Sequence, residues 1–341
     1  MKLNQALSGT AVALTFLLGP AVHAATPDEP VKLIKTIPLP DINDGDFDHF
    51  AVDLKRNRLY VSVENHHSID VFNLKTGEHL MSGGPVTTPH SLALNVEKNE
   101  LFVADGGDKA VKVLDGSDLH LIKRIDIDGT PDSAGYDPKT RDFYLVASEP
   151  GEHPTHSTIH IISTEDLKTK GEIPIESGSL HSLTIDQATR RMFVNIRDKS
   201  TIGIIDMNRN ALVQTWSVPG LTLNTPMAFD AKNHRLFVAD KKPGKLFVLN
   251  SDTGATIATY GCAEGGDDMT YDARTKRIYV SAAQGLTAYQ QDDADHYHEI
   301  ARIDTHGGKT SVLVPSLDQL YVPHTRTSAP EAGLEIYKVK G

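Results

Sequence analysis

Residues 50–63 read FAVDLKRNRLYVSV, and this stretch decides the fold. An apolar run ends at Asp53, a short polar turn follows, and a second apolar run centres on Tyr60-Val61. Apolar alternation interrupted by a polar turn is the pattern of two antiparallel strands. The phrase occurs seven times, and its aromatic residues are Tyr60, Phe102, Tyr144, Phe193, Phe237, Tyr279 and Tyr321.

The spacing between copies is 42 residues in four cases, and 49 and 44 in the other two. A repeat of this length made of short strands is typical of a propeller blade. A third strand follows the second, for example at residues 69–72 and 246–249, and turn pairs such as Thr76-Gly77 lead into a fourth. The sequence therefore predicts an all-β fold, a seven-bladed β-propeller with four-stranded blades.

The two ends of the chain predict how the ring closes. The last repeat stops after its third strand, at residues 334–338. Near the N-terminus, residues 33–37 (LIKTI) form a spare strand that resembles residues 121–125 (LIKRI), the fourth strand of the second blade. We expect this N-terminal strand to complete the last blade, because closure removes the exposed strand edges that invite aggregation.

The first 24 residues have the pattern of a cleavable signal peptide. Lys2 supplies a positive charge, residues 11–18 are largely apolar, and Val22-His23-Ala24 offers small residues at the cleavage positions. The apolar run is too short to span a bilayer, although an uncleaved anchor is the alternative. We expect cleavage after Ala24, a periplasmic or secreted protein without a membrane span, and one propeller domain over residues 25–341.

The net charge and the cysteine content limit the classes of partner and the compartment that we expect for this protein. The formal net charge is −11, which argues against a general nucleic-acid or anionic-membrane surface, since both need clustered Lys and Arg. The single cysteine, Cys262, allows no internal disulfide and favours the periplasm over the extracellular medium. Cys262 is expected to be a half-buried small residue, with a soft metal ligand as the alternative. We expect a monomer.

Three copies of the phrase, Tyr60-Val61-Ser62-Val63, Phe193-Val194-Asn195-Ile196 and Tyr279-Val280-Ser281-Ala282, resemble the repeat of the YVTN-repeat β-propellers. That family is bacterial and archaeal, mostly exported, and similar in shape to the beta subunits of some periplasmic dehydrogenases. The resemblance covers the chain after the signal peptide and implies the propeller fold. It implies no active site, because the family includes binding proteins, surface-layer components and enzyme scaffolds without a shared catalytic set.

In a propeller, the loop leading into the innermost strand and the loop between the second and third strands open on one face, the mouth of the central channel. Aligning the repeats on their aromatic residue places His49, His90 and His181 at or beside the same position on that face. Glycine-rich loops around them allow close approach of the backbone to a ligand. The ligand-binding residues predicted in this way are Asp48, His49, His90, Asp132, His181, Asp267, Asp268, Lys309 and His324.

Imidazole and carboxylate groups together suit a divalent metal such as zinc, copper or iron, and His49, His90 and His181 are the predicted ligands. A hydrated polar funnel is the alternative.

Three functions stay open: a protein that binds a small ligand, a metal ion or a partner protein at the mouth; a metal-assisted hydrolase, lyase or lactonase; and a docking subunit of a periplasmic redox enzyme. In the enzyme, a carboxylate would act as the base. The candidates for that base are Asp132, Asp267 and Glu64.

Two other polar segments are expected to be structural. Residues 292–298 (DDADHYH) form an acidic run on the opposite face that we interpret as a solvated turn, since it lacks the glycine and the terminal glutamate of a calcium loop. Residues 148–156 contain His153 and His156 in the longest insertion, which Pro154 makes an exposed loop rather than a helix.

Overall fold

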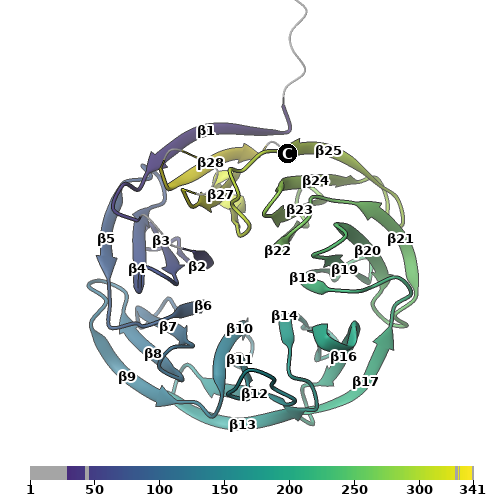
Figure 1. Ribbon diagram of the computed structural model, residues 1–341, viewed down its shortest axis with the longest axis horizontal. Coiled ribbons are helices and arrows are strands. Elements are labelled where there is room, and N and C mark those ends of the chain that lie inside the picture. Colours follow the sequence, from purple (N-terminus) through teal and green to yellow (C-terminus); the bar gives the residue numbers. More distant parts are fainter. Residues whose placement is uncertain (1–28, 43–45, 327–328, 330, 340–341) are drawn as a thin grey trace, which may run out of the picture.

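The computed structural model describes residues 29–42, 46–326, 329 and 331–339. Within these residues, seven four-stranded antiparallel sheets stand around one axis, as a seven-bladed β-propeller (Figure 1). The predicted fold class is thereby confirmed, whereas the predicted signal peptide lies outside the described residues. The described part of the chain holds no helix long and apolar enough to cross a membrane.

Blades 1 to 6 follow one another along the chain, and each runs from its innermost to its outermost strand. Blade 1 contains β2 (Phe47–Asp53), β3 (Arg58–Val63), β4 (Ser68–Asn73) and β5 (His79–Gly83); blade 2 contains β6 (Pro89–Asn95), β7 (Glu100–Asp105), β8 (Ala110–Asp115) and β9 (Leu121–Asp126); blade 3 contains β10 (Thr130–Asp137), β11 (Asp142–Ser148), β12 (Ser157–Ser163) and β13 (Lys168–Ile175). Blade 4 contains β14 (Leu180–Asp186), β15 (Arg191–Ile196), β16 (Thr201–Asp206) and β17 (Ala211–Ser217); blade 5 contains β18 (Asn224–Asp230), β19 (Arg235–Asp240), β20 (Lys245–Asn250) and β21 (Thr256–Gly261); blade 6 contains β22 (Gly266–Asp272), β23 (Arg277–Ala282), β24 (Gly285–Gln291) and β25 (Tyr297–Ile303).

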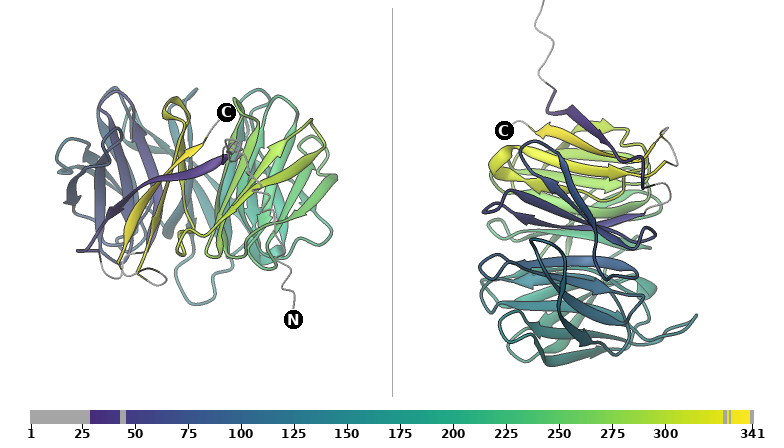
Figure 2. Two further views of the ribbon diagram at one scale, coloured as in Figure 1. Left: turned by 90° about the horizontal axis from the view of Figure 1, so that it is seen from above. Right: turned by 90° about the vertical axis from the view of Figure 1, so that its left-hand side faces the viewer.

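Blade 7 joins the two ends of the chain. Its inner strands are β26 (Val312–Val314), β27 (Gln319–His324) and β28 (Gly333–Val339), and its outermost strand is β1 (Val31–Pro38). β1 pairs antiparallel with β28, with Val31 opposite Val339 and Ile37 opposite Leu334. Figure 2 shows β1, in purple, beside the yellow C-terminal strands. The predicted closure of the last blade by the N-terminal strand is confirmed.

The repeated aromatic residue explains the period of the sequence, because it packs between adjacent blades. The core of the described residues consists of seven apolar clusters, one between each pair of neighbouring blades. Tyr60 packs between blades 1 and 2, Phe237 between blades 5 and 6, and Tyr321 between blades 7 and 1. Two tyrosines add a hydrogen bond to the next blade: the Tyr60 hydroxyl donates to the Gly116 carbonyl at 2.8 Å and the Tyr321 hydroxyl to the Leu74 carbonyl at 2.7 Å.

The Asp or Asn that ends each innermost strand holds the following turn. The Asp53 carboxylate accepts the backbone N–H of Arg56 at 2.9 Å, and the Asp137 carboxylate accepts that of Lys139 at 2.9 Å. Short polar side chains that accept backbone N–H groups two or three residues ahead fix tight turns. Blade 7 departs from this rule, since Val314 occupies the position and a short 3₁₀ helix, η2 (Pro315–Leu317), makes the turn.

Deletion of residues 31–39 should sharply lower the melting temperature. Burial of Val31, Ile37 and Leu39 is lost, on the order of 5 kcal/mol of stability at 1.5–3 kcal/mol per side chain. The β28 edge is also left unpaired. Thermal unfolding followed by circular dichroism measures the effect, with Ile34→Ser as the control because Ile34 in β1 is 49% exposed. An unchanged transition in the deletion variant contradicts closure by β1.

Candidate functional site

The mouth of the channel is built from the beginnings of the innermost strands. β2, β6, β10, β14, β18 and β22 lie nearest the axis (Figure 1). Each of these six strands has an irregular register near its start, for example between Phe47 and Phe50 in β2 and between Pro89 and Leu92 in β6. Such bulges redirect side chains out of the regular alternation of a strand. They therefore position Asp48, His49 and His90 at the mouth.

One imidazole is surrounded by three carboxylates. His90 Nδ1 lies 2.9 Å from Asp48 Oδ2, 3.4 Å from Glu64 Oε1 and 3.9 Å from Asp132 Oδ1. Asp48 in β2 and Glu64 in the loop between β3 and β4 come from blade 1, His90 in β6 from blade 2 and Asp132 in β10 from blade 3, so three adjacent blades contribute. One ligand atom each from Asp48, Glu64 and His90 lies within 4.8 Å of the others, which is a group able to hold a metal ion.

The charges of this group depend on one another. Burial alone would lower the pKa of His90, but hydrogen bonds to Asp48 and Glu64 and the charge of Asp132 raise it to about 10. Burial alone would raise the pKa of Asp48, but His49, His90 and Lys309 hold it well below its usual range. His90 is therefore an imidazolium at neutral pH, and Asp48 is a carboxylate.

His49 and His181 line the mouth outside this group. His49 Nε2 lies 3.3 Å from Asp48 Oδ1. Burial alone would lower the pKa of His49, but the charges of Asp48 and Asp268 raise it. Burial lowers the pKa of His181, and the Nδ1 atom of that ring lies 3.4 Å from the Ser182 hydroxyl. Neither histidine belongs to a potential metal group within the described residues, so the structure does not gather the three predicted histidine ligands around one point.

A second part of the mouth is neutralised by lysines. Asp267 Oδ1 lies 2.9 Å from Lys241 Nζ, and Asp267 Oδ2 lies 3.3 Å from Lys309 Nζ. Burial alone would raise the pKa of Asp267, but these two ammonium groups lower it. Lys309 also pairs with Asp46 at 2.8 Å. The sequence analysis missed Lys241 and Asp46, although Lys241 directly follows the last residue of β19 and Asp46 directly precedes β2.

A cavity of about 250 Å³ adjoins the mouth. Its lining includes His49, Ser91, Asp268 and Ser311. Asp268 Oδ2 accepts the backbone N–H of Ser311 at 3.3 Å, and burial raises the pKa of Asp268. The predicted residues Asp48, His49, His90, Asp132, His181, Asp267, Asp268 and Lys309 are thus linked by contacts or charge interactions around one opening. His324 lies elsewhere, beside His306 and Glu335 in blade 7.

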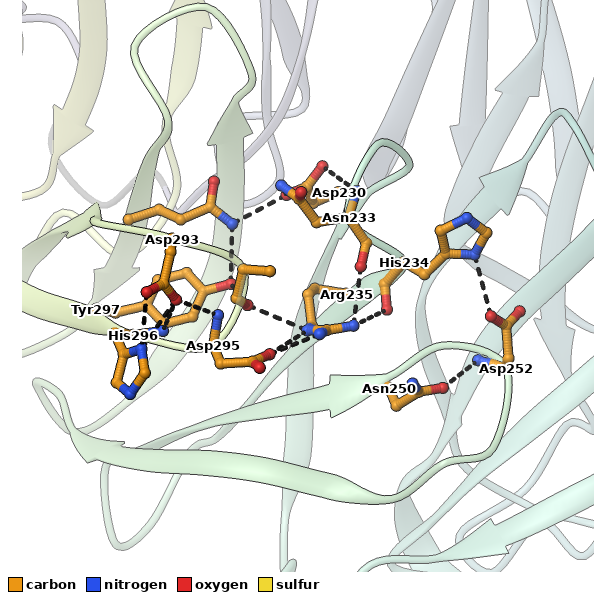
Figure 3. Close-up of polar contacts among 12 residues, drawn as sticks. Asp230, Asn233, His234, Arg235, Asn250, Asp252, Asp293, Asp295, His296 and Tyr297 are labelled. Atoms are coloured by element: carbon orange, nitrogen blue, oxygen red, sulfur yellow. Dashed lines mark hydrogen bonds and ion pairs between the residues drawn. The ribbon is translucent and has the colours of Figure 1, made fainter.

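The acidic run at residues 292–298 forms a turn that hydrogen bonds and ion pairs hold in place, as Figure 3 shows. The Asp293 carboxylate accepts the backbone N–H groups of Asp295 and His296 at 2.8 and 3.0 Å. Arg235 of blade 5 forms an ion pair with Asp295, and the Tyr297 hydroxyl donates to the Ala294 carbonyl at 2.9 Å. These internal contacts fit the interpretation as a solvated turn.

Cys262 lies in the connection between β21 and β22 and is buried. Burial raises the pKa of its thiol to about 12. A thiol with such a pKa is protonated at neutral pH and is a weak nucleophile. Cys262 belongs to the apolar cluster between blades 5 and 6, together with Phe237 and Tyr289, as expected for a small packed residue.

The chain is a seven-bladed β-propeller with a polar, charge-paired channel mouth, and no protein-family model matches it. Two curated relatives, each named uncharacterized protein YncE, come from Salmonella typhimurium (strain LT2) and Salmonella typhi and are 21% and 20% identical to it over 210 residues. The matched region makes up 60% of this chain and 56% of each relative, so the similarity spans little more than half of those proteins.

Among solved structures, a chain from the crystal structure of the mitotic checkpoint complex matches with a TM-score of 0.74 and 12% identity. The match covers 99% of this chain and 100% of the other, and at that identity it shows a shared fold alone. Membership of the YVTN-repeat family stays a prediction.

The protonation of His90 can be measured directly. Nuclear magnetic resonance of imidazole nitrogens should show His90, assigned with a His90→Gln variant, still charged at pH 8, since its pKa of about 10 lies above that pH. An ordinary histidine with a pKa near 6.5 is neutral there. Asp48→Asn should move the titration of His90 to lower pH, whereas Asp118→Asn, beside His120 in blade 2, should not. A neutral His90 at pH 8 contradicts the described charge state.

Proposed function

We propose that this chain is an exported propeller that binds a divalent metal ion at the mouth of its central channel. The observation that carries the proposal is the contact of His90 with Asp48, Glu64 and Asp132. Three carboxylates repel one another at such separations, and the proton on His90 is the nearest compensating charge. A divalent cation in place of that proton neutralises the group more completely.

The spacing of the ligand atoms supports a metal of the zinc type. The contacts of 2.9 and 3.4 Å from His90 Nδ1 to Asp48 and Glu64 are close to the edge of a tetrahedron with bonds of about 2.1 Å, which is roughly 3.4 Å. One imidazole and two carboxylates form a mixed nitrogen and oxygen set that suits zinc and similar transition metals. Asp132 is close enough to act as a further ligand or to orient one.

His49 supports this site from the channel. Asp48 contacts His90 through Oδ2 and His49 through Oδ1, so the orientation of its carboxylate is fixed from both sides. Partners of this kind fix the orientation of a metal ligand. The adjoining cavity of about 250 Å³ is lined by His49 and Ser91, the sequence neighbours of Asp48 and His90, and has room for water or a small ligand. We therefore propose a metal-dependent binding site with an open side.

Export rests on the N-terminal sequence pattern and on the single cysteine, which is compatible with an oxidising compartment because no disulfide can form within the chain. The alternatives of a metal-assisted hydrolase, lyase or lactonase, and of a docking subunit for a redox enzyme, stay predictions. The raised pKa of Asp268, within the channel cavity, is the feature most relevant to an enzyme, because catalytic acids have such pKa values.

The test is zinc binding by untagged protein that has been treated with a chelator and then dialysed against buffered free zinc. The Asp48→Asn, Glu64→Gln double variant should lose one equivalent of zinc relative to wild type. The Asp118→Asn variant, which removes an exposed carboxylate beside His120, is the matched control and should lose none. Circular dichroism verifies that each variant is folded.

Zinc binding at the mouth should also release a proton from His90, and should weaken as the pH falls, because the metal and the proton compete for the same nitrogen. Calorimetry in two buffers with different ionisation enthalpies counts the released protons.

Equal zinc content in the wild type and the folded Asp48→Asn, Glu64→Gln variant rules out the proposed site.

A further inference from the structure

A second group of potential metal ligands lies away from the channel, in blade 7. His306 belongs to the connection between β25 and β26, His324 is the last residue of β27, and Glu335 lies in β28. One ligand atom from each lies within 4.8 Å of the others. His306 Nδ1 is 2.9 Å from Glu335 Oε1, and the rings of His306 and His324 have their centroids 5.3 Å apart. Three separate segments therefore converge on one point.

His324 contributes one imidazole nitrogen to this group. Its Nδ1–H donates to the Thr325 carbonyl at 3.2 Å. His324 is 4% exposed, and its Nε2 lies beside Gly333. Metal-binding histidines commonly donate one ring N–H to a carbonyl in this way, which orients the other nitrogen toward the metal.

Gly333 preserves the space beside that nitrogen. A Cβ atom at residue 333 would lie 2.7 Å from His324 Nε2 and 3.2 Å from Cε1, closer than side chains normally pack. The backbone at Gly333 pairs with β1 and β27 and has an ordinary conformation. A side chain at residue 333 would therefore displace the His324 ring, whereas the backbone conformation itself does not demand glycine.

Glu335 is a buried carboxylate with little compensating charge. It is 1% exposed, its Oε2 accepts the Tyr337 hydroxyl at 2.6 Å, and its Oε1 faces His306. Within the described part of the chain, Glu335 forms an ion pair with His306 alone. Burying an ionised carboxylate costs free energy unless a cation is nearby, and a metal ion would supply that charge.

A cavity of about 240 Å³ opens beside the three side chains. Leu33, Thr36 and Pro38 of β1 form one wall, and Thr36 lies opposite Glu335 in the pairing of β1 with β28. β1 supplies no ligand but closes one side of this cavity, which leaves room for water or a small anion to complete the coordination.

We propose that His306, His324 and Glu335 form a second divalent-metal site, which takes zinc or ferrous iron and binds more strongly when β1 closes blade 7. Two imidazoles and one carboxylate are a ligand set of both catalytic zinc and non-haem iron sites. Because the ligands come from three segments next to the closing strand, the metal binds the closed ring better than the open chain and stabilises it.

Zinc binding in the background of the Asp48→Asn, Glu64→Gln variant tests this site independently of the channel mouth. That variant should retain one equivalent of zinc, and adding His306→Ala should remove it. The His306 side chain is 41% exposed, so its loss leaves the core intact. The control adds His298→Ala instead, which removes an exposed histidine paired with Asp292 on the opposite face and should leave the equivalent in place.

Gly333→Ala provides a second variant that keeps all three ligands. It should lower zinc affinity at least tenfold, because the new methyl group fills the space beside His324 Nε2. Zinc should also raise the melting temperature of the Asp48→Asn, Glu64→Gln protein and leave that of its His306→Ala derivative unchanged. Retention of the zinc equivalent after His306→Ala, or its equal loss after His298→Ala, overturns the proposal.

Discussion

The pairing of β1 with β28 is the interaction on which the rest of this structure depends. It closes blade 7, and it lets Ile37 and Leu39 pack with Leu59 and Phe72 of blade 1. An open ring would leave the β28 edge unpaired and the interface between the first and last blades exposed. Closure also completes the mouth, because Lys309 before β26 forms its ion pair with Asp46 before β2 across this junction.

A closed ring brings the starts of the innermost strands together, and their charges then have to be balanced within a small volume. On one side, Lys241 and Lys309 neutralise Asp267. On the other side, His90 Nδ1 faces Asp48 and Glu64 at 2.9 and 3.4 Å, with Asp132 at 3.9 Å. In the absence of metal, the proton of His90 offsets only part of this negative charge, and it leaves His90 and its neighbours arranged as ligands. The Asp267 side already holds two ammonium groups, whereas the His90 side keeps an excess of negative charge. We therefore expect a cation to bind on the His90 side.

The sequence predicted the ring and its closure, because the 42-residue period and the spare strand reflect packing that every blade repeats. Around the mouth it missed Lys241 and Asp46, and it included His324, which lies in blade 7. It could not predict which histidines meet. Side-chain directions at His49, His90 and His181 depend on bulges at the starts of the strands, and bulges leave no mark in an apolar alternation. The group around Glu335 was missed because residues 334–337 (LEIY) were interpreted as a core strand. An acidic residue within an apolar strand could have indicated a buried polar site.

Diffraction from crystals of the intact protein loaded with zinc, measured on both sides of the zinc absorption edge, tests the charge balance at the mouth most directly. We expect an anomalous peak bonded to His90 Nδ1, Asp48 and Glu64, with the contact of 2.9 Å between His90 and Asp48 replaced by two bonds to the metal. A fully loaded crystal in which His90 still contacts Asp48 directly, without a peak between them, would contradict the proposal that a cation takes the place of the proton.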